Sequence, residues 1–62
     1  MKAWVIKRKD GKYYNELHNI FVKLLCQATL YDGNGECKCR ILITKLADCE
    51  PVQVDVNELG NE

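Results

Sequence analysis

Apolar and polar positions follow a strand pattern at the start of the chain. Residues 3–6 are the apolar run Ala-Trp-Val-Ile, and these residue types favour strands. Because the side chains of a strand alternate between two faces, Trp4 and Ile6 share one face and Ala3 and Val5 share the other. Both faces are apolar, so we predict a strand that is covered on both sides.

A turn follows this strand at Asp10-Gly11. The pair is favoured in two-residue hairpin turns of type I′, which need positive φ at both central residues. The chain then returns as a second strand that contains Tyr13 and Tyr14. The register predicted from this turn places Lys9 opposite Lys12, Arg8 opposite Tyr13, and Lys7 opposite Tyr14.

Two further strands are predicted later in the chain. Residues 28–31 are Ala-Thr-Leu-Tyr, a short run that ends at the Asp-Gly-Asn-Gly break of residues 32–35. After Pro51, valines at every second position alternate with polar residues, which predicts a half-buried strand over residues 51–56. Proline is tolerated at the start of a strand or at a sheet edge.

Residues 15–27 have a helical pattern. Asn15 is a suitable N-cap residue, and the apolar positions after it match the i, i+3, i+4, i+7 spacing of one helix face. These positions are Leu17, Ile20, Phe21, Leu24, Leu25 and Ala28. We therefore expect a short helix here, with a loosely packed loop as the alternative, because Val22 and Cys26 lie off this face.

Residues 36–46 fit two patterns about equally well. The inward positions of a strand would be Cys37, Cys39, Ile41 and Ile43. The apolar stripe of a helix would be Cys39, Leu42, Ile43 and Leu46, with Asp32 or Asn34 as the N-cap. The pattern by itself does not choose between a helix and a strand.

The length and composition are typical of one small globular domain. The chain has 62 residues, of which 47% are apolar and 29% charged. We predict a domain over residues 1–57 and a flexible tail over residues 58–62. The net charge is zero, but residues 1–31 hold six basic and two acidic residues (+4), whereas residues 32–62 hold three basic and seven acidic ones (−4). This asymmetry allows head-to-tail self-association, with two solvated charged faces as the alternative. The neutral total gives no general attraction to nucleic acid or membrane.

The start of the chain predicts a cytoplasmic protein. Only four consecutive apolar residues precede the first basic cluster, which is too few for a secretory signal. No run approaches the ~20 apolar residues that span a bilayer, so we expect no membrane partner. In the cytosol, thiols stay reduced, so we expect no disulfide.

Four short motifs resemble small bacteriophage and prophage proteins. They are Trp-Val-Ile-Lys at residues 4–7, Asp-Gly-Lys-Tyr-Tyr at 10–14, Ala-x-Leu-Tyr at 28–31 and Pro-Val-x-Val at 51–54. In that family a helix and a final strand follow the third strand, so the resemblance implies a helix over residues 36–46. It implies no activity, cofactor or functional residue. The predicted fold is α+β: a small antiparallel or mixed sheet, made of the N-terminal hairpin and two strands, with one helix packed on one face.

The cysteines and the one histidine are the candidate metal ligands: Cys26, Cys37, Cys39, Cys49 and His18. Zinc sites commonly use Cys-x2–4-Cys pairs, whereas ten, one and nine residues separate the cysteines here. On a helix, Cys37 and Cys39 would point about 160° apart, away from a shared metal. The spacing therefore predicts no metal site and no cofactor, and a metal-stabilised module is the alternative that the five ligands leave open. We also predict no catalytic site, because a chain this short has little room for a cleft.

Two binding functions remain. The first is a non-enzymatic, phage-type accessory protein that binds another protein, including a second copy of itself. The alternative is nucleic-acid binding by the basic hairpin, where lysine and arginine would neutralise phosphates and aromatic rings would stack on bases. The residues of this candidate site are Lys7, Arg8, Lys9, Lys12, Tyr13 and Tyr14.

Overall fold

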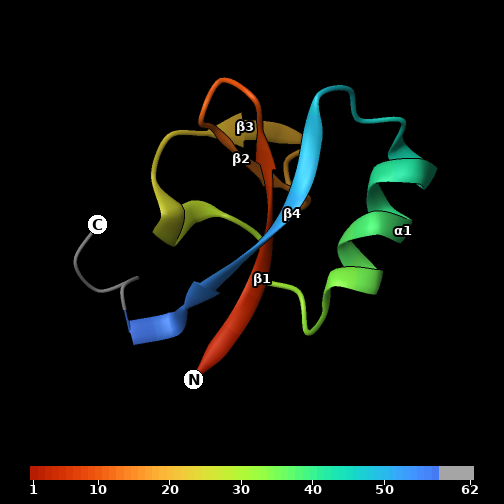
Figure 1. Ribbon diagram of the computed structural model, residues 1–62. Helices are drawn as coiled ribbons and strands as arrows, with labels where there is room; N and C mark the ends of the chain where they lie inside the picture. Colours follow the sequence, from red (N-terminus) through yellow and green to blue (C-terminus); the bar gives the residue numbers. More distant parts are fainter. Residues whose placement is uncertain (58–62) are drawn as a thin grey trace.

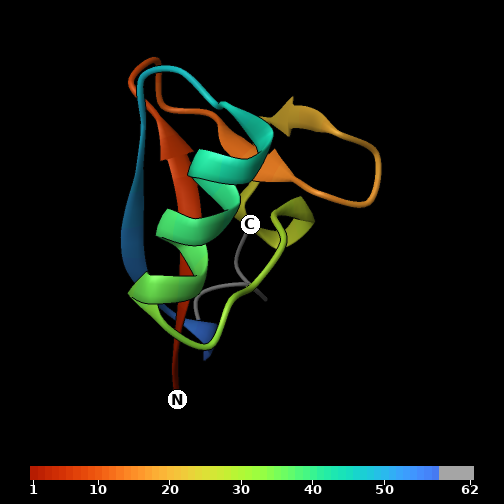
Figure 2. The same ribbon diagram turned by 90° about the vertical axis from the view of Figure 1, so that its right-hand side faces the viewer.

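The computed structural model describes residues 1–57, which form a four-stranded sheet, one α-helix and a short 3-10 turn. In chain order the elements are β1 (Lys2–Arg8), β2 (Tyr13–Asn15), β3 (Ile20–Val22), η1 (Leu25–Gln27), α1 (Asn34–Thr44) and β4 (Cys49–Asp55). The strand order is β3-β2-β1-β4 and all neighbours are antiparallel. Helix α1 lies on one side of the sheet, and the η1 segment lies on the other side of β1 (Figures 1 and 2). The predicted α+β fold is confirmed.

Strands β1 and β4 form the long centre of the sheet. They pair over seven positions, from Lys2 opposite Asp55 to Arg8 opposite Cys49. Val5 and Ile6 are fully buried on opposite faces of β1. The predicted strand covered on both sides is therefore confirmed, and so is a strand that starts near Pro51.

The hairpin forms, but its predicted register is wrong by one residue. Lys7, rather than Arg8, lies opposite Tyr13. The Gly11 N–H donates to the Arg8 carbonyl at 2.9 Å, and the Arg8 N–H donates to the Lys12 carbonyl at 2.7 Å. These bonds enclose a three-residue loop that ends in a left-handed glycine, with φ of 93° at Gly11. The loop needs positive φ only at glycine, whereas the predicted type I′ turn would also require it at Asp10.

The helix predicted for residues 15–27 is wrong. A four-residue turn occupies residues 16–19, where Asn19 has a φ of 53° and the Asn15 side chain accepts a hydrogen bond from the His18 N–H. The chain then pairs as β3 against β2 and ends in η1. The β-branched residues Ile20 and Val22 favour a strand, and Asn19 favours the left-handed turn that precedes it.

The strand predicted over residues 28–31 is reduced to one bridge. Tyr31 pairs with Trp4 through two backbone hydrogen bonds of 2.7 and 2.9 Å. This bridge occupies the edge of β1 that the short strand β2 leaves uncovered. Its consequence is that the Tyr31 side chain is fixed beside α1.

Residues 34–44 are helical, so the strand pattern considered for residues 36–46 is wrong. The N-cap residue of this helix is Gly33, rather than the predicted Asp32 or Asn34, and the C-cap residue is Lys45, which has a left-handed conformation. Its Cys37 is fully buried among Ile6, Tyr14 and Tyr31. The predicted tail, residues 58–62, lies outside the described residues.

Candidate functional site

Helix α1 carries apolar side chains on its outward side as well as its inward side. Cys37 and Ile41 pack into the core, but Leu42 is 77% exposed and Ile43 is 65% exposed. Of the stripe that the sequence predicts for a helix, Cys39, Leu42 and Ile43 thus face solvent. Its fourth member, Leu46, packs against the core. A helix with two apolar sides has more apolar surface than this domain buries.

One side of this exposed stripe borders a groove between α1 and the edge strand β4. The groove has a volume of about 370 Å³ and is mostly apolar. It is lined by Lys38, Ile41, Leu42, Cys49, Glu50 and Pro51. Its charged residues lie on opposite walls, because Lys38 belongs to the helix and Glu50 to the strand.

The outer edge of β4 is a poor site for adding another strand. Trp4 uses its backbone groups to bond Tyr31, so its neighbours Ala3 and Val5 turn theirs toward β4. In the register of β4, the backbone groups of Val52 and Val54 are then directed toward β1, and those of Pro51 are directed toward the free edge. Proline has no N–H, so the free edge lacks a donor in its middle, as expected of a protected edge.

The basic hairpin uses its arginine internally. The Arg8 guanidinium forms an ion pair with Asp10 at 2.7 Å and lies 4.0 Å from the centre of the Phe21 ring. The hydrogen bond from Arg8, aided by one from the Lys12 N–H, lowers the pKa of Asp10 to about 2. Arg8 is thus already paired with a carboxylate and an aromatic ring.

The remaining hairpin residues are divided between the two faces of the sheet. Tyr14 is buried, and its hydroxyl donates to Asn19 at 2.7 Å, so it offers no face for stacking. The Lys7 ammonium lies 5.7 Å from the centre of the Tyr13 ring, on the face away from α1. Lys9 is exposed and Lys12 is half-buried. The predicted set therefore does not form one continuous surface.

The cysteines do not gather into a site. All four are free thiols. Cys37 is buried and Cys39 is exposed, as expected for two positions on opposite sides of a helix. Among residues 1–57, no three His, Cys, Asp or Glu side chains are close enough together to hold a metal ion.

The sequence prediction missed the groove, because its walls come from segments far apart in the chain. One sequence feature points to it: residues 37–46 contain apolar residues at both inward and outward helical positions. In the part of the chain that the structure describes, no helix is long and apolar enough to cross a membrane. No protein-family model, curated protein or solved structure matches this chain. The resemblance to bacteriophage proteins therefore stays a prediction.

Proposed function

We propose that this chain is a small, non-enzymatic accessory protein of the phage type that acts by binding a protein, and that the partner is a second copy of itself. The observation that carries the proposal is the apolar groove between α1 and β4, which is lined in part by the exposed Leu42. Burying such surface contributes about 25 cal/mol for each Å² removed from water.

The groove has the layout that a two-fold interface requires. In such an interface the same patch meets itself, so it must contain both a protruding group and a recess. Leu42 supplies the protruding side chain and also lines the recess. A second requirement is charge complementarity, which Lys38 on the helix wall and Glu50 on the strand wall provide: each Lys38 would face the Glu50 of the other copy.

The first test is the mass of the protein in solution, measured by size-exclusion chromatography with light scattering. The unchanged protein is expected to elute with twice its chain mass of 7.1 kDa. Leu42→Glu is expected to give a monomer, because it places a carboxylate in the apolar interface. Leu17→Glu is the matched control, since Leu17 is 84% exposed and lies outside the groove. A monomer at every protein concentration would show that the homodimer proposal is wrong.

Exchanging the charges at positions 38 and 50 tests whether Lys38 of one copy faces Glu50 of the other. Lys38→Glu alone and Glu50→Lys alone are each expected to weaken the dimer, because like charges would then face each other. The double variant is expected to restore it. If the double variant is as weak as the sum of the two single ones, the proposed pairing is incorrect.

Nucleic-acid binding by the hairpin is a second candidate function. One observation favours it: Lys7 lies over the Tyr13 ring, and strand alternation places both side chains on the sheet face opposite the buried Ile6 and Tyr14. Fluorescence polarisation with single- and double-stranded DNA tests it. The variant with Lys7, Lys9 and Lys12 all changed to Glu is expected to lose binding, whereas Lys38→Glu keeps it. DNA binding that survives the triple change would rule out the hairpin.

A further inference from the structure

The residues Asn34 and Gly35 at the start of α1 form a pair that can react with itself. The backbone nitrogen of a residue can attack the side-chain amide of an asparagine that precedes it, and glycine obstructs this attack least because it has no Cβ. Gly35 is exposed, and no heavy atom from another part of the chain lies within 4 Å of a Cβ placed there. The surroundings therefore leave room for the ring that such an attack forms.

The nitrogen of Gly35 has no acceptor inside the helix. The first helical hydrogen bond runs from the Cys37 N–H to the Gly33 carbonyl at 3.4 Å, so the N–H groups of the two residues after Gly33 lie before the start of this ladder. Gly33 is the N-cap residue and has no side chain that could accept from them. An N–H without an acceptor is free to lose its proton to hydroxide, and the nitrogen then becomes a nucleophile.

The Asn34 amide is free as well, unlike the amides of two other asparagines. The Asn15 amide donates to a backbone carbonyl at 2.8 Å and accepts from a backbone N–H at 3.0 Å. The Asn19 amide accepts from the Tyr14 hydroxyl at 2.7 Å. In the described part of the chain, no side-chain hydrogen bond holds Asn34, which is exposed. Its amide can therefore rotate toward the next residue, whereas the other two are held in place.

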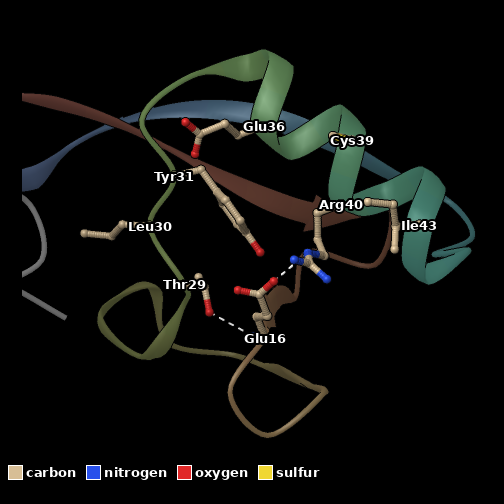
Figure 3. Close-up of a pocket in the computed structure, with 8 residues that line it drawn as sticks. All are labelled: Glu16, Thr29, Leu30, Tyr31, Glu36, Cys39, Arg40 and Ile43. Carbon is tan, nitrogen blue, oxygen red and sulfur yellow. Dashed lines mark hydrogen bonds and ion pairs between the residues drawn. The ribbon is translucent and has the colours of Figure 1, made fainter.

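The first turn of α1 is also its least anchored part. Cys37 is fully buried, and about one turn later Arg40 forms an ion pair with Glu16 (Figure 3). The same view shows the Glu36 side chain directed away from this pair. Helix ends fray, so the first turn can open while the rest of α1 stays packed. This opening gives Asn34 the backbone freedom that ring closure requires.

The pair Asp10-Gly11 shows the opposite situation. The Asp10 carboxylate is held by the Arg8 guanidinium, and the Gly11 N–H donates to the Arg8 carbonyl at 2.9 Å, so both reacting groups are occupied. The pair Asp32-Gly33 is less reactive for a chemical reason, because an ionised carboxylate repels a nucleophile that a neutral amide accepts.

We propose that Asn34 is a site of spontaneous deamidation. The Gly35 nitrogen, having lost its proton, forms a bond to the side-chain carbonyl carbon of Asn34. The bond from this carbon to the amide nitrogen breaks, and ammonia leaves. Water then opens the cyclic imide at one of its two carbonyls, which gives aspartate or isoaspartate. In sum, asparagine and water become an acid and ammonia.

The two products act on α1 in opposite ways. Aspartate places a negative charge at the first helical position, where the helix dipole favours it, and four residues before Lys38, where an ion pair along the helix is favourable. Isoaspartate adds a methylene group to the backbone inside the first turn. It therefore disrupts the hydrogen bond from Cys37 to Gly33, and the helix is expected to begin later in this form.

The test is mass spectrometry of the folded protein and its peptides during incubation at mildly alkaline pH. The unchanged protein is expected to gain the mass of an amide-to-acid change at residue 34, before residues 15 and 19 and faster as the pH rises. Gly35→Ala is expected to lose most of this conversion over the time in which half of the unchanged protein converts. Conversion at residue 34 no faster than at residues 15 and 19, or an unchanged rate in Gly35→Ala, would overturn the proposal.

A pair of variants at the N-cap tests the role of the free first turn. Gly33→Ser supplies a hydroxyl that accepts from the N–H groups of this turn, whereas Gly33→Ala supplies none. Conversion in Gly33→Ser is therefore expected to be about fivefold slower than in Gly33→Ala. Equal rates would show that the freedom of the helix start does not control the reaction. Residue 34 does not line the apolar groove, so this proposal and the homodimer can fail separately.

Discussion

Asp10 stabilises the hairpin turn through two neighbours. Its carboxylate pairs with the Arg8 guanidinium at 2.7 Å and accepts a hydrogen bond from the Lys12 N–H at 3.1 Å. Both contacts favour the ionised form. Because the pKa falls from 3.8 to about 2 on folding, the stabilisation is complete above the ordinary pKa and is lost as the pH falls through about 2.

We predict that this shift depends mainly on Arg8. In Arg8→Gln the pKa of Asp10 is expected to rise toward 3.8, because the charged hydrogen bond is lost and only the Lys12 N–H remains. Carboxyl carbon NMR shifts followed against pH measure it. Lys9→Gln is the control and is expected to leave the pKa of Asp10 unchanged. An Asp10 that already titrates near 3.8 in the unchanged protein would show that the ion pair does not form.

The thiols provide a test of how α1 is oriented. Burial, aided by the charge of Glu36, raises the pKa of Cys37 and so lowers its thiolate fraction at neutral pH. Cys39 is exposed. We predict that iodoacetamide modifies Cys39 and Cys26 first and Cys37 last, as mapped by mass spectrometry over time. Equal rates at Cys37 and Cys39 would mean that the helix does not present Cys37 to the core.

At the scale of elements, glycines set one turn and weaken one helix. Gly11 has a φ of 93°, a backbone conformation that L side chains rarely adopt, although no heavy atom lies within 4 Å of a Cβ placed there. The hairpin therefore needs glycine for its backbone and not for space. Gly35 lies inside α1, has open space around it, and has no positive φ.

These two positions are expected to respond to alanine with opposite sign. Gly11→Ala should lower the free energy of unfolding by about 1 kcal/mol, the cost of a left-handed L-residue. Gly35→Ala should raise it by about 0.5 kcal/mol, since alanine is the better helix former. Urea denaturation of both variants measures the difference. A Gly11→Ala protein as stable as the unchanged one would contradict the three-residue loop.

At the scale of the whole molecule, two features can bring copies of the domain together. The first half of the chain is basic and the second half acidic, so head-to-tail attraction is one route to self-association. The apolar groove is another route, and Lys38 and Glu50 are the charged residues that line it. Salt separates the two routes, because it screens exposed charges and leaves apolar contacts intact.

We predict that the dimer persists in about 1 M NaCl, where the screening length falls to about 3 Å. Sedimentation at low and high salt measures this. The Leu42→Glu change should dissociate the dimer in both conditions, whereas Lys38→Glu should act mainly at low salt. Complete dissociation of the unchanged protein by salt would favour the head-to-tail mode over the groove.

Much of the sheet could be predicted, because its pattern is local. Ala3 to Ile6 are apolar on both strand faces, and the residues after Pro51 alternate, so β1 and β4 follow from short stretches of sequence. The site could not be predicted in this way. Lys38 and Glu50, or Glu16 and Arg40, are brought together only when α1 packs on the sheet.

The sequence by itself determined that strands pass through residues 3–6 and 51–55 and that a turn lies at Gly11, because strand alternation and positive φ are properties of neighbouring residues. Only the tertiary structure decided between helix and strand for residues 34–44. It also decided which side of α1 is buried. The helix has apolar residues on two sides, and the sheet has room for only one of them, so packing rather than periodicity left Leu42 and Ile43 in solvent.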